Sequence, residues 1–121
     1  MFREKLQQMI ERTEGATGAL IMGTDGIAVE KVLLSEGQDT NLDVAAAEFT
    51  SLLRNAQRAG NDTGLGHLHE LVIGFDEMSV IVRLFNPEYF AVLAVRADGN
   101  LGRGRFELRK AELDLAREFA I

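Results

Sequence analysis

The sequence contains no cysteine, and this absence removes several classes of site at once. Disulfides, zinc sites built on thiolates and cysteine nucleophiles are all excluded. Positive charge is also scarce, because 13 lysine and arginine residues stand against 19 aspartate and glutamate residues, for a net charge of −6. Nucleic acids and anionic membrane surfaces bind clustered positive charge, so neither is an expected partner.

Long apolar runs are missing as well. No run approaches the roughly 20 residues that a membrane-spanning helix requires. The first ten residues, MFREKLQQMI, carry charges where a signal peptide has its apolar core. We therefore expect a cytoplasmic protein. A length of 121 residues with 46% apolar residues suits one domain with one core, covering residues 1–121.

Motifs for catalysis or cofactor binding are absent too. None of the three serines lies in a GxSxG elbow. Gly99, Gly102 and Gly104 are spaced GxxGxG, without the lysine and hydroxyl of a P-loop and without a parallel βαβ unit, so they predict a tight strand-to-helix turn. His67 and His69 would share one face of a strand, but no third metal ligand is nearby. We predict no catalytic residue, no cofactor, no metal and no enzymatic activity.

Hydrophobic periodicity predicts an ordered series of helices and strands. Helices are expected at 2–14, 41–60 and 105–121, and strands at 16–23, 27–34, 67–75, 78–85 and 89–96. In the last helix Leu108, Ala111, Leu115 and Phe119 form the apolar stripe, which Leu113 widens. The short connections force antiparallel neighbours. Strands 78–85 and 89–96 are apolar on both faces, which indicates a sheet covered on both sides. The three helices supply the covers, so the fold class is α/β (α+β), a three-layer sandwich with a five-stranded antiparallel sheet.

The alanine-rich helix 41–60 is the most informative element for function. Its apolar stripe is wider than one sheet face requires. The surplus fits either contact with a second subunit or a well-buried core helix, and the residues alone favour neither. Strand 67–75 adds weight to pairing, since an edge strand offers unpaired backbone groups to another chain.

Two segments now point to a known family. MFREKLQQMIERTEGATGALIMGTDGIAVE and EYFAVLAVRADGNLGRGRFELRKAELDL resemble the Roadblock/dynein light-chain family, and particularly its bacterial MglB-type members. The resemblance implies a single Roadblock-like domain with a profilin-like fold, strand order 2-1-5-4-3, between one helix and two helices. It also implies a homodimer in which strand 67–75 and helix 41–60 meet their copies. The interface residues implied by position are Phe49, Leu53, Ala56, Leu68, Glu70 and Val72.

The same resemblance implies a function. The paired helices would form a platform that binds a small Ras-like GTPase of the MglA type, and the protein would act as a non-enzymatic regulator, activating the GTPase by aligning the GTPase's own residues. The platform residues implied by position are Glu48, Ser51, Leu52, Asn55, Gln57 and Arg58. Two alternatives remain open: a scaffold in a motility, polarity or signalling complex without effect on hydrolysis, and a ligand sensor related to GAF and PAS domains.

Overall fold

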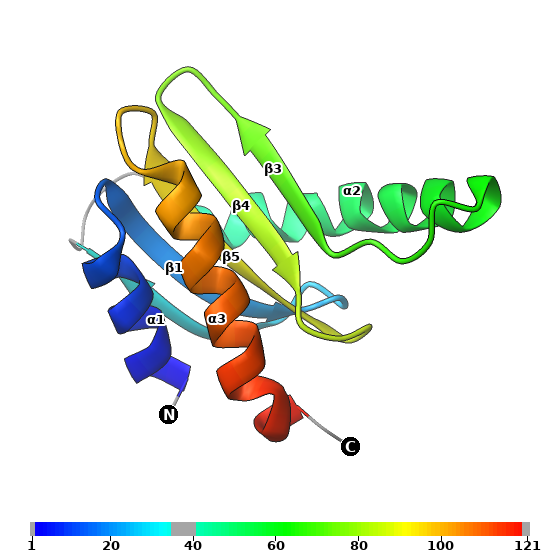
Figure 1. Ribbon diagram of the computed structural model, residues 1–121, viewed down its shortest axis with the longest axis horizontal. Coiled ribbons are helices and arrows are strands. Elements are labelled where there is room, and N and C mark those ends of the chain that lie inside the picture. Colours follow the sequence, from blue (N-terminus) through cyan, green and yellow to red (C-terminus); the bar gives the residue numbers. More distant parts are fainter. Residues whose placement is uncertain (1, 35–40, 120–121) are drawn as a thin grey trace.

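The structure, a computed structural model, describes residues 2–34 and 41–119, with side chains described as far as Ala116. Its helices and strands (Figure 1) are, in chain order, α1 (Phe2–Arg12), β1 (Ala16–Gly23), β2 (Ala28–Leu33), α2 (Leu42–Thr63), β3 (Glu70–Gly74), β4 (Met78–Leu84), β5 (Tyr89–Arg96) and α3 (Leu101–Phe119).

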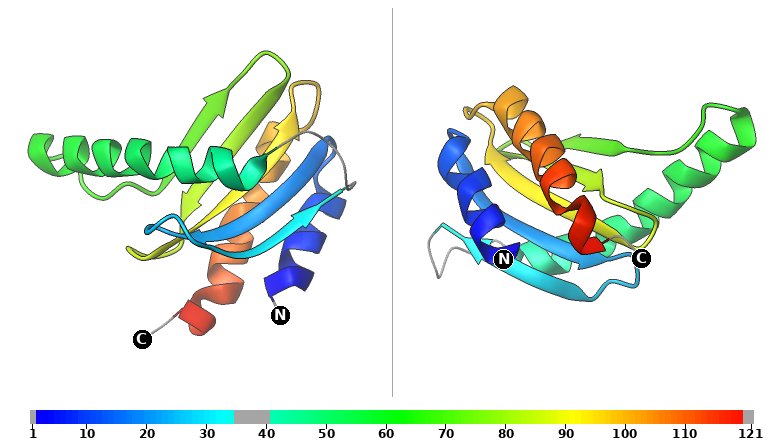
Figure 2. Two further views of the ribbon diagram at one scale, coloured as in Figure 1. Left: turned by 180° about the vertical axis from the view of Figure 1, so that it is seen from behind. Right: turned by 60° about the horizontal axis from the view of Figure 1, so that its bottom comes forward.

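The five strands form one antiparallel sheet in the order β2-β1-β5-β4-β3. Helices α1 and α3 cover one face, and α2 crosses the other (Figure 2). The predicted fold class and strand order are therefore confirmed. Strands β2 and β3 are the two edges of the sheet, as the strand order implied by the resemblance requires.

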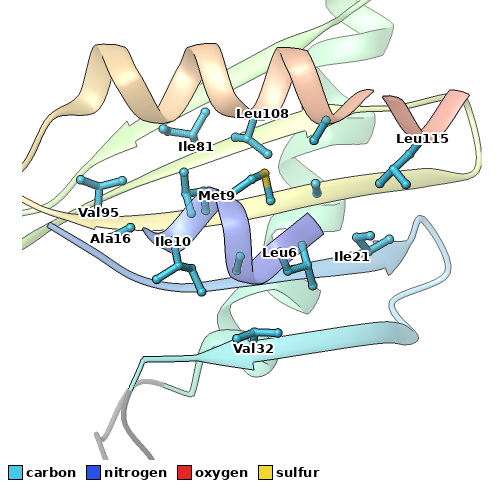
Figure 3. Close-up of a cluster of buried hydrophobic side chains, with 14 residues drawn as sticks. Leu6, Met9, Ile10, Ala16, Ile21, Val32, Ile81, Val95, Leu108 and Leu115 are labelled. Carbon is cyan, nitrogen blue, oxygen red and sulfur yellow. The ribbon is translucent and has the colours of Figure 1, made fainter. Parts of the chain in front are cut away.

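The core consists of two apolar layers, one on each side of the sheet. Along β5, Ala91, Leu93 and Val95 face α1 and α3, where they join the cluster drawn in Figure 3. The alternate residues Phe90, Val92 and Ala94 face α2. Because side chains alternate across a strand, an unbroken apolar run fills both layers. The expectation of a sheet covered on both faces is thus confirmed.

Several element boundaries differ from the predicted ones. Helix α1 ends at Arg12 rather than at residue 14, and β3 covers only Glu70–Gly74 rather than 67–75. Helix α2 does not end at Gly60 but continues to Thr63, and Gly64 closes it in the left-handed conformation with φ of 76°. The amide groups of Leu65 and Gly66 both donate to the Gly60 carbonyl, so Gly60 belongs to the terminal capping arrangement and does not interrupt the helix.

Helix α3 begins at Leu101, four residues before the predicted start at residue 105. Asn100 is the reason. Its side-chain Oδ1 accepts a hydrogen bond from the Arg103 amide at 2.9 Å, and its carbonyl accepts one from the Gly104 amide at 3.1 Å. The apolar stripe of α3 is also narrower than predicted, because Leu113 is 72% exposed and points away from the sheet.

Gly104 allows α3 to lie close to the sheet. A Cβ at this position would lie 2.9 Å from Cδ1 of Ile81 and 3.1 Å from Cδ2 of Leu93. We expect Gly104→Leu to destabilise the fold by about 1–3 kcal/mol, because the added atoms overpack this layer. Gly102→Ala is the matched control: Gly102 is exposed and its Cβ would meet only ordinary contacts, so higher helix propensity should stabilise it by up to about 1 kcal/mol. Urea denaturation of both variants measures the difference, and equal midpoints would contradict the packing argument.

Candidate protein-interaction site

Helix α2 is longer than the sheet face that it covers. At 1.5 Å per residue its 22 residues span about 33 Å. Leu42, Ala46, Phe49 and Leu53 are buried against the sheet and belong to its core layer. Within α2, all of which the structure describes, the only buried residue beyond Leu53 is Gly60. Figures 1 and 2 show this second half of α2 projecting past the sheet, so that it has little of the described chain to pack against.

Most of the predicted platform residues gather on the side of α2 that faces away from the sheet. Helical spacing and exposure place Glu48, Ser51, Leu52, Asn55 and Arg58 on this side. The Leu52 side chain is 48% exposed, so an apolar group faces solvent among polar neighbours. The sixth, Gln57, lies apart from them: it is half-buried and lines a hollow beside residues 67–69.

The predicted interface residues of α2 divide into two groups. Phe49 and Leu53 are buried in their own chain's core, so little of either side chain is left for a second subunit. Ala56 is half-buried on the projecting half of the helix. Leu68, in the connection to β3, is also half-buried and packs against the same core layer. Sequence periodicity could not reveal the division within α2, because Phe49, Leu53 and Ala56 all fall within one wide apolar stripe.

Strand β3 presents its outer backbone groups without a strand partner in the described part of the chain. The Leu84 amide donates to the His69 carbonyl, and the Phe75 amide donates to the Met78 carbonyl. In an antiparallel pair the direction alternates along the strand, so Glu70, Val72 and Gly74 direct their N–H and C=O groups outward. The side chains of Val72 and Phe75 are exposed along this edge. The edge lacks the lysines and prolines that discourage pairing with another strand.

The predicted interface residue Glu70 takes part in an ion-pair cluster that ties β3 to the rest of the fold. One of its carboxylate oxygens pairs with Arg83 of β4 at 3.0 Å, and the other with Arg105 of α3. Arg83 also pairs with Glu112 of α3 at 2.6 Å. The Arg83 side chain is only 13% exposed, so its guanidinium satisfies two carboxylates that are themselves mostly shielded. The signal in the sequence for such a cluster is Arg83 itself, the one charged residue of the otherwise largely apolar strand β4.

The glycine-rich loop allows two backbone segments to pack closely. Two of the backbone amides that a phosphate site would need already have partners: the Gly99 amide donates to the Arg96 carbonyl, and the Asn100 amide donates to the Glu14 carbonyl, both at 2.8 Å. Gly99 lies against the turn after α1, where a Cβ would come within 2.6 Å of the Glu14 carbonyl oxygen. The predicted tight turn with close backbone packing is confirmed, except that Gly102 and Gly104 lie inside α3.

The two histidines do not form a metal centre with neighbouring residues. His67 and His69 are exposed and precede β3. In the described part of the chain, no three histidine, aspartate or glutamate side chains come close enough to hold a metal ion. The same two histidines line the hollow of about 290 Å³ that Gln57 borders, together with Leu68, Asn86 and Glu112 among others. This hollow lies at one end of β4 and is bordered by Leu84, a residue of the core layer beneath α2.

Among the described helices, none has a stretch long and apolar enough to cross a membrane.

Comparison with known proteins agrees with this architecture. The family model of the Roadblock/LC7 domain matches residues 2–97. The crystal structure of MglC from Myxococcus xanthus is 34% identical, with a TM-score of 0.72 over 98% of each chain. MglB, a gliding protein from Thermus thermophilus, is 22% identical, with a TM-score of 0.84 over 95% of this chain and 85% of that one.

A Roadblock/LC7 domain from Streptomyces avermitilis shares the fold at 15% identity, with a TM-score of 0.85 over 98% of this chain and 97% of that one. Among curated proteins, no sequence matches the chain significantly. The family model covers most of the chain, and the similarity to MglC extends over nearly all of it. The chain therefore belongs to the Roadblock/LC7 family.

Proposed function

We propose that this protein is a homodimeric, non-enzymatic regulator of a small Ras-like GTPase. The observation that carries the proposal is the combination of the projecting half of α2 with the uncovered edge of β3. Within the described chain, the edge of β3 leaves polar backbone groups without a partner, and the projecting half of α2 leaves apolar side chains without one. The two features lie on the same side of the molecule (Figure 1). A second copy related by a two-fold axis meets both needs, because each copy offers the same surface.

In the proposed dimer, the two β3 strands pair antiparallel and join the two sheets into one. Glu70, Val72 and Gly74 of each copy supply the outward backbone groups. The two α2 helices then lie together beneath the joined sheet, with Ala56 and Leu68 near the contact. Phe49 and Leu53 support this arrangement from within, since they hold α2 against its own sheet.

The GTPase would bind to the platform formed by the outward sides of the paired α2 helices. Glu48, Ser51, Asn55 and Arg58 offer hydrogen bonds and charges around the exposed Leu52. This chemistry suits recognition of a protein surface, because an apolar centre with a polar rim is typical of protein interfaces. We propose that the protein supplies no catalytic group of its own and acts by positioning the catalytic groups of the GTPase.

A hydrolysis assay tests the proposal. A purified Ras-like GTPase encoded beside this gene is assayed for GTP turnover with and without this protein, and we expect binding and faster turnover. Leu52→Asp should weaken binding at least about tenfold, because it places a charge in the apolar centre of the platform. Leu113→Asp is the matched control, since Leu113 is also an exposed helix leucine but lies on the opposite layer. An unchanged rate without binding would overturn the proposal.

The same assay separates the scaffold alternative from regulation. A scaffold binds the GTPase, loses binding on Leu52→Asp and leaves the turnover rate unchanged. The sensor alternative receives less support, because the hollow beside Gln57 is bordered by exposed residues such as His67, His69 and Pro87 and does not enclose a ligand. A cytoplasmic location stays a prediction.

A further inference from the structure

The outer side of α3 carries two large apolar side chains that face solvent. Phe106 is 56% exposed and Leu113 is 72% exposed. They are seven residues apart, which places them on one side of the helix, two turns from each other. The opposite side, with Leu108, Ala111 and Leu115, is buried against the sheet. In Figure 1 α3 lies in front of the sheet with no other described element over it.

Positive charge surrounds these two side chains. Arg103, Arg109 and Lys110 are exposed and lie on the same outward side by helical spacing. The Arg103 guanidinium lies over the Phe106 ring, 5.4 Å from its centre. This local surplus of positive charge stands out in a chain whose net charge is −6.

The carboxylates of α3 are turned away from this side or already paired. Glu107 is only 3% exposed and pairs with Arg103 at 2.8 Å and with Arg12 of α1 at 3.9 Å. Glu112 faces Arg83 of β4. Asp114 lies at the seam with α1, where Lys5 donates a hydrogen bond at 2.8 Å that lowers the pKa of the Asp114 carboxyl below its ordinary value of 3.8. Of the three cations on the outward side, Arg103 is therefore paired with Glu107, whereas Arg109 and Lys110 form no ion pair among the described residues.

We propose that this surface, formed by Arg103, Phe106, Arg109, Lys110 and Leu113, docks an acidic amphipathic helix of a partner protein. Two apolar anchors one heptad apart match the spacing of apolar residues on such a helix. The flanking cations match carboxylates beside those anchors and would fix the orientation of the bound helix.

A single helix fits this surface better than an anionic membrane does. Helix α1 lies beside α3 in the same layer, and its exposed charges are of both signs, Arg3 and Arg12 beside Glu4 and Glu11. A membrane plane would contact both helices, and the mixed charge of α1 would add little to its attraction, whereas a helix lying along α3 contacts only the strip where cations and apolar anchors coincide.

The α3 surface is separate from the proposed GTPase platform. The sheet lies between α3 and α2 (Figure 2), so both surfaces can be occupied at once. The inference does not depend on GTPase regulation. It would make the protein a connector that holds an acidic helix on one face while the other face binds its own partner.

The experiment uses the full chain, labelled with ¹⁵N, and three probes. The first is a synthetic acidic amphipathic peptide of about 18 residues, or five helical turns, with leucines one heptad apart and glutamates flanking them. The second is a scrambled peptide of the same composition, and the third is a vesicle containing phosphatidylglycerol. We expect the amphipathic peptide alone to bind, to shift amide signals of residues 102–113, and to bind more weakly as salt rises.

Two variants complete the design. Phe106→Ala combined with Leu113→Asp should weaken peptide binding at least about tenfold, because both anchors are lost. Leu52→Asp, on the opposite face, should leave peptide binding unchanged. Thermal melts confirm that both variants are folded, which the exposure of the altered side chains favours. Equal binding of the scrambled peptide, preferential binding to vesicles, shifts confined to α2, or no binding at all would each overturn the inference.

Discussion

Replacing Val72 by proline is expected to convert the proposed dimer into monomers while leaving the fold of each subunit intact. The Val72 amide points away from β4, because the hydrogen bonds between β3 and β4 are made by the alternate residues. Proline therefore removes no hydrogen bond within the chain, and it is tolerated on a strand edge that faces solvent. In the dimer, each substitution removes one amide hydrogen-bond donor from the pair of β3 strands. The proline ring also occupies space where the partner's strand would lie.

The expected size of this effect follows from two lost hydrogen bonds per dimer. At about 0.5–1.5 kcal/mol each, with the added steric cost, the dissociation constant should rise about 10- to 100-fold or more. Sedimentation velocity over a range of concentrations measures it. Val72→Thr is the matched control, since threonine keeps the amide and the β-branched shape and should remain dimeric. If Val72→Pro sediments as a dimer with unchanged affinity, β3 is not the interface.

Replacing Arg83 by leucine should produce the largest loss of stability among changes at a polar residue. Its guanidinium is the partner of Glu112 and one of two cations beside Glu70. After the substitution Glu70 still has Arg105, but the Glu112 carboxylate stays next to the sheet without an opposite charge. Breaking a shielded ion pair in this way costs about 3–5 kcal/mol when burial is complete, so partial exposure makes about 2–3 kcal/mol the expected loss.

Chemical denaturation measures this loss, and two further variants show its origin. Arg83→Lys keeps the charge but cannot bridge both carboxylates, so it should lie between the wild type and Arg83→Leu. Adding Glu112→Gln to Arg83→Leu should recover part of the stability, since it removes the unpaired charge. If the double variant is no more stable than Arg83→Leu alone, the cost comes from packing and the ion-pair explanation is wrong.

The two halves of α2 show how much of a helix's environment the local sequence pattern can predict. The i, i+3, i+4 spacing of Leu42, Ala46, Phe49 and Leu53 predicts a helix with a buried side, and the structure confirms it. The same spacing includes Leu52 and Ala56, yet these are not in the core. Periodicity describes one helix alone, and only the angle at which α2 crosses the sheet decides which part of its stripe is covered.

The layered architecture follows from the amino-acid pattern alone, because strands β4 and β5 are apolar on both faces and must be covered on both. Connections too short for a crossover determined that β3, β4 and β5 are antiparallel neighbours. Two features emerge only when the chain is folded: the ion-pair cluster of Glu70, Arg83, Glu112 and Arg105, and the exposure of Phe106 and Leu113 to solvent. The physical reason is that helix and strand periodicity arises from neighbouring residues, whereas charge pairing and exposure depend on segments brought together from distant parts of the chain.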